Sequence, residues 1–279
     1  MRIVTLQSPD GPVAAIERAN ERFVIKDVNG RAIRDVGELL RTGNWPSLAE
    51  AAMTKAVTNW PVLRPILEPG ATVCVGLNYK KHVLEMGRQL PTVPTLFSKL
   101  PRALTDPEAT IPLPAASSMM DYEGELVIVI GNGGRDIPMA KAWDAVAGFT
   151  LLNDVTARDF QKRSLQWFAG KSWERSTPVG PVFVTVDELS NFGDREISTL
   201  VNGEERQRSP ISDLIFDVPT LVSDLSQVIH LQPGDMIATG TPGGVGDAMK
   251  PPSYLKPGDV VEISFDGIGT LRNRFESAS

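Results

Sequence analysis

Two glutamates at the start of an apolar run are the first residues in this chain whose types and spacing could do chemistry. The segment reads Asp121-Tyr122-Glu123-Gly124-Glu125-Leu126, and apolar residues continue to Ile130. On a β-strand, residues two apart point to the same face, so Glu123 and Glu125 are expected to lie side by side. Neighbouring carboxylates repel each other unless a cation or a proton lies between them. The pair therefore indicates a cation site, although a solvated strand edge could carry the same residues.

A third carboxylate, Asp154, stands at the end of another apolar run, which spans residues 148–155. Added to Glu123 and Glu125, it would complete one face of a site made only of oxygen ligands. Such a site favours Mg²⁺, Mn²⁺ or Ca²⁺ over zinc. The alternative is that Asp154 caps the N-terminus of a helix expected over residues 157–166.

His82 and Glu85 form a possible general-base pair. They lie three residues apart in a helix expected over residues 79–86, so their side chains are neighbours on its surface. A carboxylate beside an imidazole orients the ring and raises its basicity, which is what activation of a water molecule requires. Because Lys80 and Lys81 precede the pair, an exposed polar helix face is the alternative interpretation.

Two glycine-containing segments could contact a ligand, but neither fits a nucleotide-binding motif. Gly170-Lys171-Ser172 lacks the earlier glycine of a phosphate-binding loop, because Leu165 occupies that position. Lys171 could instead neutralise an oxyanion of a substrate. The glycine spacing of Thr239-Gly240-Thr241-Pro242-Gly243-Gly244-Val245-Gly246 differs from that of a dinucleotide fingerprint. Glycines do let backbone approach a ligand closely, and the hydroxyl of Thr241 could then bind a carboxylate.

The composition is that of an ordinary globular protein with many turns. Of 279 residues, 42% are hydrophobic and 22% charged, and 24 glycines with 22 prolines favour a β-rich architecture. A net charge of −6 without a cluster of Lys and Arg argues against nucleic acid as a partner. No apolar run reaches the ~18 residues of a membrane span, and the N-terminus lacks the apolar core of a signal peptide. The single cysteine, Cys74, cannot form an internal disulfide, which favours the cytoplasm.

The pattern of apolar residues and turns divides the chain into two units. Residues 1–68 are expected to form a small N-terminal α+β domain, and residues 69–279 a β-rich catalytic domain. Strands are expected over residues 1–6, 13–16, 22–28, 72–75, 122–130, 148–155, 182–186, 198–201, 236–239 and 260–265. Besides the helices at 79–86 and 157–166, we expect helices over residues 36–40, 47–58, 138–145 and 218–228.

Taken together, these motifs resemble the fumarylacetoacetate hydrolase superfamily. The matching segments are Val75-Gly76-Leu77-Asn78-Tyr79 with His82 and Glu85, Asp121 to Leu126, Asn153 to Asp159, Gly170-Lys171-Ser172, and Thr239 to Gly246. They cover about residues 70–275 in the order that the family has them. The resemblance implies a mixed α/β, β-rich fold, a distorted barrel or sandwich roll with a small N-terminal domain, and a homodimer.

The same resemblance implies what each site residue does. One Mg²⁺ or Mn²⁺ ion per subunit would be held by Glu123, Glu125 and Asp154. His82, Glu85 and Lys171 would be catalytic. The positions that match substrate contacts are Tyr79, Arg158, Gln161 and Thr241.

The reaction that we expect first is hydrolysis of a carbon–carbon bond in a small 2,4-dioxo acid, an acylpyruvate-like substrate of the kind met in aromatic catabolism. Decarboxylation of oxaloacetate and isomerisation or tautomerisation of a 2-oxo acid use the same metal site, so they stay open. A non-catalytic protein that binds a metal or ligand is the alternative from another class.

Overall fold

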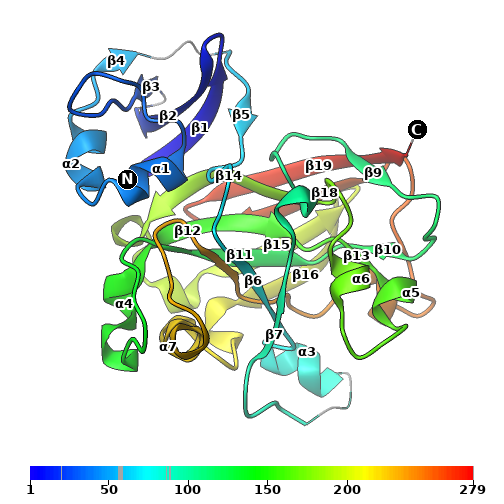
Figure 1. Ribbon diagram of the computed structural model, residues 1–279. Helices are drawn as coiled ribbons and strands as arrows, with labels where there is room; N and C mark the ends of the chain where they lie inside the picture. Colours follow the sequence, from blue (N-terminus) through cyan, green and yellow to red (C-terminus); the bar gives the residue numbers. More distant parts are fainter. Residues whose placement is uncertain (20, 56–58, 86, 88, 279) are drawn as a thin grey trace.

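The structure, a computed structural model, describes residues 1–19, 21–55, 59–85, 87 and 89–278. In these residues two β-sheets pack face to face, with short helices at their edges (Figure 1). This arrangement confirms the β-rich mixed α/β class expected from the sequence. None of the described helices is long and apolar enough to cross a membrane.

The larger sheet joins the N-terminal strands to the strands that carry the site. Its described strands follow the order β4-β3-β2-β1-β14-β12-β11-β17-β6-β7, with β5 paired to β1 and β8 paired to β14. Their bounds are β1 (Arg2–Ser8), β2 (Gly11–Arg18), β3 (Glu21–Val24), β4 (Thr54–Lys55), β5 (Val62–Leu63), β6 (Thr72–Gly76), β7 (Thr95–Ser98), β8 (Leu104–Thr105), β11 (Gly124–Ile130), β12 (Val146–Asn153), β14 (Thr177–Thr185) and β17 (Met236–Ala238).

The smaller sheet covers one face of the larger one. Its order is β16-β15-β18-β19-β9, and a separate two-stranded ribbon pairs β10 with β13. The bounds are β9 (Ile111–Leu113), β10 (Met120–Asp121), β13 (Thr156–Ala157), β15 (Glu196–Val201), β16 (Glu204–Pro210), β18 (Val260–Phe265) and β19 (Gly269–Ser277).

Strand β11 lies in the centre of the molecule, and all seven of its residues are buried. Leu126 and Ile128 on one face belong to the core cluster that includes Ile263 of the smaller sheet. Val127 and Val129 on the other face belong to a second cluster, which includes residues of the N-terminal helices. Because both faces are covered, the strand is a continuous apolar run rather than an alternating one.

Seven described α-helices lie around the sheets: α1 (Val36–Arg41), α2 (Trp45–Glu50), α3 (Lys80–Glu85), α4 (Ala142–Ala145), α5 (Arg158–Gln161), α6 (Phe168–Lys171) and α7 (Val218–Val228). Helix α7 has the bounds predicted from the sequence. The Asp217 side chain caps it by accepting a hydrogen bond from the Thr220 amide at 3.0 Å. Leu221, Val222 and Leu225 form the buried face that the helical period requires.

Two expected helices end several residues before their predicted C-termini. The helix expected over residues 47–58 ends at Glu50, and Thr54–Lys55 pairs with β3 as a strand; residues 56–58 lie outside the described part of the chain. The helix expected over residues 157–166 is only the single turn α5, followed by turns and by α6.

The N-terminal residues lie at one end of the molecule, away from α3, α5 and α6 (Figure 1). Strand β1 pairs with β14 through Arg2 opposite Val184 and Ile3 opposite Phe183. Backbone hydrogen bonds thus make the N-terminal strands part of the larger sheet. The division into domains at residues 68 and 69 stays a prediction.

Candidate metal centre

The structure brings together the three acidic residues that the sequence singled out. Glu123, Glu125 and Asp154 are all buried, and one carboxylate oxygen from each lies within 4.8 Å of the others. Among the described residues they form a set of three oxygen donors with the spacing that a hard divalent cation requires.

The pairing of β11 with β12 explains why these residues meet. Gly124 lies opposite Asn153 and Glu125 opposite Leu152. The strand begins at Gly124, so Glu123 precedes it rather than belonging to it. Glu123 is still fixed, because its amide donates to Asn153 Oδ1 at 3.0 Å and its carbonyl accepts from the Asp154 amide at 2.8 Å.

The alternative interpretations of the acidic residues are wrong. Glu123 and Glu125 do not lie on a solvated strand edge, because both side chains are buried. Asp154 is not a helix cap, because the residue at the N-cap of α5 is Ala157.

Two buried lysines compensate part of the negative charge. Lys171 Nζ donates to Glu123 Oε2 and to Asp154 Oδ2, both at 2.7 Å, and Lys99 Nζ pairs with Asp154 Oδ1. Burial alone would raise the pKa of the Asp154 carboxyl, but the two ammonium groups outweigh it and lower this pKa. Burial would lower the pKa of Lys171, yet Asp154 and Glu123 raise it, so this side chain is cationic.

Glu125 is the member of the triad that lacks such compensation. Its Oε2 accepts a hydrogen bond from the Gly240 amide at 2.9 Å, and in the described part of the chain its carboxylate forms no ion pair. Burial, together with the charges of Asp154 and Glu123, raises its pKa well above the ordinary value. A bound cation would relieve this repulsion, so the residues fit the divalent ion that the sequence predicts.

Arg158 is held beside the triad by two carboxylates. Its Nη1 lies 2.6 Å from Glu123 Oε1, and its Nε donates to Asp121 Oδ2 at 2.8 Å. Nη1 also donates to Gln161 Oε1 at 3.0 Å. The third nitrogen, Nη2, is buried and has no hydrogen-bond partner among the described residues. This guanidinium therefore has a donor left over for an anion.

A cavity of about 510 Å³ adjoins the triad, and Glu123 is the triad residue that lines it. Most of the predicted site residues line it, namely His82, Glu123, Arg158, Gln161, Lys171 and Thr241. Thr241 Oγ1 accepts a hydrogen bond from Gln207 Nε2 at 2.7 Å and donates to the Gly124 carbonyl at 3.1 Å. Gly240, at φ +96°, has a backbone conformation that L-residues rarely adopt, and it brings its amide to Glu125.

Besides Glu125 and Asp154 of the triad, which do not line the cavity, two further predicted residues are not placed at its surface. Tyr79 is wholly buried and does not line the cavity, although a substrate contact was expected of it. The backbone of Glu85 ends α3, but its side chain lies outside the described part of the structure. The predicted pairing of His82 with Glu85 therefore stays a prediction.

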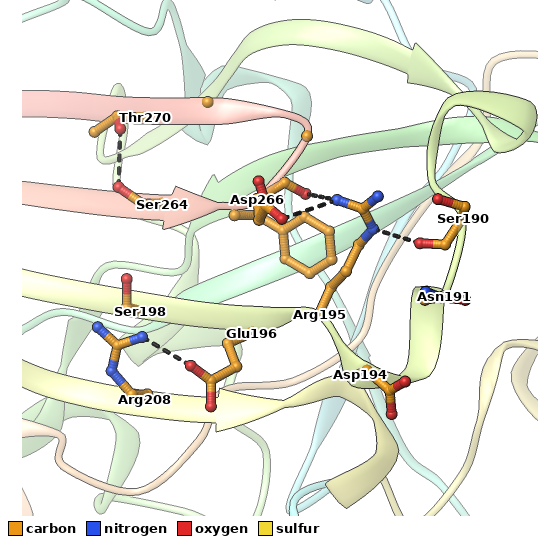
Figure 2. A pocket seen from close by; sticks show the side chains of 13 residues that line it. Ser190, Asn191, Asp194, Arg195, Glu196, Ser198, Arg208, Ser264, Asp266 and Thr270 are labelled. Carbon is orange, nitrogen blue, oxygen red and sulfur yellow. Dashed lines mark hydrogen bonds and ion pairs between the residues drawn. The ribbon is translucent and has the colours of Figure 1, made fainter.

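A second hollow, of about 720 Å³, lies over the smaller sheet (Figure 2). Both of its arginines form ion pairs within it: Arg195 with Asp266 at 3.2 Å and Arg208 with Glu196 at 2.8 Å. It is larger than the cavity beside the triad, but it is shallower and holds none of the buried acidic residues. We therefore place the chemistry at the triad.

Comparison with known proteins agrees with this site. Residues 71–276 match the family described as fumarylacetoacetate (FAA) hydrolase, C-terminal. The chain belongs to the fumarylacetoacetate hydrolase family. All three triad residues and every residue that lines the cavity lie within the matched part.

Within this family, the chain is similar to proteins named for different reactions. Oxaloacetate tautomerase YisK of Bacillus subtilis (strain 168) is 43% identical over 214 residues, 75% of this chain and 71% of that protein. The mitochondrial oxaloacetate tautomerase FAHD2A of Bos taurus is 36% identical over 289 aligned residues, which cover 98% of this chain and 91% of that protein. A solved structure of fumarylacetoacetate hydrolase (EaFAH) from psychrophilic Exiguobacterium antarcticum matches with a TM-score of 0.87 and 36% identity over all of both chains.

Three residues of the site were not found from the sequence. Lys99 contacts a triad carboxylate, Asp121 holds Arg158, and Gln207 holds Thr241. Lys99 follows a strand in a proline-rich region, and Gln207 lies in a strand that the sequence did not predict. Of the three, only Asp121 could have been found from the sequence, because it lies two residues before the acidic pair of Glu123 and Glu125.

Proposed function

We propose that this protein is a divalent-cation-dependent enzyme that interconverts the keto and enol forms of a small 2-oxo dicarboxylic acid such as oxaloacetate. The observation that carries the proposal is the buried triad of Glu123, Glu125 and Asp154 beside a cavity whose wall holds Arg158 with an unused donor. Two relatives that bear the name oxaloacetate tautomerase, 43% and 36% identical, support this reaction over the hydrolysis expected first from the sequence.

The bound cation would supply a Lewis acid for the oxygens of the 2-oxo acid. The protein's own residues supply the rest. Lys171 is fully charged and lies between two carboxylates, so it offsets negative charge on an enolate formed beside it. His82 lines the same cavity and is the candidate to take the proton from carbon 3. The proton lost at carbon 3 is replaced by one on the 2-oxygen, so no water is consumed.

The experiment uses chelator-stripped protein with oxaloacetate, with and without Mg²⁺ or Mn²⁺. The enol absorbance should reach equilibrium faster only when both protein and metal are present, with no release of pyruvate. Release of pyruvate and carbon dioxide would make the protein a decarboxylase instead. Absence of any metal-dependent change would refute the tautomerase proposal.

His82→Ala tests the proton-transfer role. General-base catalysis contributes about 10²- to 10⁴-fold, so the rate should fall by at least about a hundredfold while metal binding is retained. His230→Ala is the matched control, because His230 is the other of the chain's two histidines, is exposed and does not line the cavity. An undiminished rate in His82→Ala would remove His82 from the mechanism.

Hydrolysis of an acylpyruvate is the second candidate. It is favoured by the place of His82 at the cavity, where it could activate a water molecule, and by the similarity to a structure that bears the name fumarylacetoacetate hydrolase. Acetylpyruvate is the test substrate. If pyruvate and acetate form only when metal is present, hydrolysis is favoured. If neither product forms, the tautomerase proposal is retained.

A further inference from the structure

We propose that Lys162 and Asp247 form a charge switch at the mouth of the cavity, in which Lys162 exchanges the Asp247 carboxylate for the second carboxylate of the substrate. This inference rests on the proposed function, because it takes a 2-oxo acid to be the substrate. Lys162 would then set the preference of the site for dicarboxylic over monocarboxylic 2-oxo acids.

The ion pair joins two segments that both line the cavity. Lys162 follows α5 and Asp247 lies in the short 3₁₀ helix η6 (Gly246–Ala248), and both line the cavity. Lys162 Nζ lies 2.6 Å from Asp247 Oδ1. The hydroxyl of Tyr254 donates to the same oxygen at 2.7 Å. If Lys162 leaves, Asp247 therefore keeps a hydrogen bond.

This pair is connected to the metal centre through Asp121. Oδ2 of Asp121 accepts both from Arg158 Nε at 2.8 Å and from the Asp247 amide at 2.9 Å. The Gly246 amide donates to the other oxygen, Oδ1, at 2.8 Å. One buried carboxylate thus fixes the Arg158 guanidinium and the loop of Asp247 relative to each other.

Arg158 and Lys162 are neighbours on the same side of the chain. They are four residues apart, and the Lys162 amide donates to the Arg158 carbonyl at 3.0 Å, so their side chains project from adjacent turns. Nη2 of Arg158 is buried without a partner among the described residues. An anionic group bound by the Arg158 guanidinium would occupy the cavity that Lys162 also lines.

The exchange costs little because the existing pair is weak. The Lys162 side chain is 56% exposed and that of Asp247 is 24% exposed. Ion pairs between exposed groups contribute little to stability, and one carboxylate here replaces another. Arg163 does not compete for the anion, because its guanidinium stacks on the ring of Phe160 at 3.4 Å.

The test compares two acids that differ in one group. Oxaloacetate carries a carboxylate where 2-oxobutyrate carries a methyl group, on the same four-carbon chain. Dissociation constants are measured on full-length, Mg²⁺-loaded protein by tryptophan fluorescence, since Trp167 lines the cavity. Lys162→Met, which keeps the apolar stem, should weaken oxaloacetate binding roughly fivefold and leave 2-oxobutyrate unchanged.

Asp247→Asn is the matched variant with the opposite expected sign. It frees Lys162 while keeping an oxygen for Tyr254, so oxaloacetate should bind about two- to fivefold more tightly. An unchanged ratio of the two dissociation constants in Lys162→Met, or weaker oxaloacetate binding in Asp247→Asn, would overturn the switch. A wild-type protein that binds neither acid would instead overturn the proposed function, and the switch with it.

Discussion

Replacing Glu125 by glutamine should change the stability of the metal-free and the metal-loaded protein in opposite directions. Glu125 is 1% exposed, forms no ion pair among the described residues, and lies within 4.8 Å of two other carboxylates. Its pKa is raised by burial and then by Asp154 and Glu123. A carboxyl whose pKa is raised in the folded state favours folding at low pH, and this contribution is lost as pH rises through the folded pKa. At neutral pH the Glu125 carboxyl therefore destabilises the metal-free protein.

The neutral amide of Glu125→Gln removes that repulsion and keeps an oxygen for the Gly240 amide, so the metal-free variant should melt at a higher temperature than wild type. When metal is present, wild type should instead gain more stability than the variant. A cation at one hundred times its dissociation constant stabilises the wild type by about 2.7 kcal/mol. For a chain of this size, that corresponds to a rise in Tm of roughly 5 °C. The variant lacks one of three ligands, so this rise should be absent.

The assay is thermal unfolding of chelator-treated protein at neutral pH, repeated over a titration of Mg²⁺ or Mn²⁺. Glu108→Gln serves as the control, because Glu108 is exposed and lies outside the triad; its metal response should equal that of wild type. A Glu125→Gln variant that retains the full metal-dependent rise in Tm would refute the assignment of Glu125 as a ligand. A lower Tm in the metal-free variant would refute the argument from charge repulsion.

Two further substitutions test the scaffold that holds the triad. In Gly124→Ala the new Cβ would lie 2.3 Å from Thr199 Oγ1. Because residue 124 stands between the two glutamate ligands, metal affinity should fall along with Tm. In Gly131→Ala the new Cβ would lie 2.7 Å from Ala147, away from the triad, so this variant should lose ~1–3 kcal/mol of stability through overpacking and keep its metal affinity. Gln207→Leu removes three buried hydrogen bonds, each worth about 1 kcal/mol. The free energy of unfolding, measured with a denaturant, should therefore fall by about 3 kcal/mol. A fall below about 1 kcal/mol would show that Thr241 is held without Gln207.

The parts of this protein that the sequence predicts well are those set by local pattern. Helix α7 has a capping aspartate and an apolar stripe with helical period, and its predicted bounds agree with the structure. Strand β11 follows a predicted apolar run, and the two-residue spacing at its start indicated that Glu123 and Glu125 lie close together. In each case a short stretch of chain contains the whole signal.

The parts that the sequence misses depend on contacts between distant segments. Lys99 meets Asp154 across 55 residues, and Gln207 meets Thr241 across 34. Neither residue carries a local feature that distinguishes it from a surface lysine or glutamine. Strand β19 was missed for a related reason: its buried positions are Leu271, Asn273 and Phe275, and the polar Asn273 interrupts the alternation of apolar residues. Asn273 is held by the distant carbonyls of Pro107 and Ala109.

The charges around the triad explain why a dicarboxylic substrate would need a further cationic side chain at the cavity. Three triad carboxylates face two buried ammonium groups, Lys99 and Lys171, while Asp121 and Arg158 compensate each other. This leaves one negative charge, and a divalent ion turns it into one positive charge. A monocarboxylate cancels that charge, but a dicarboxylate leaves one negative charge over. Lys162 adjoins Arg158 and is held only by a partly exposed pair, so it is the cation placed to compensate the second carboxylate.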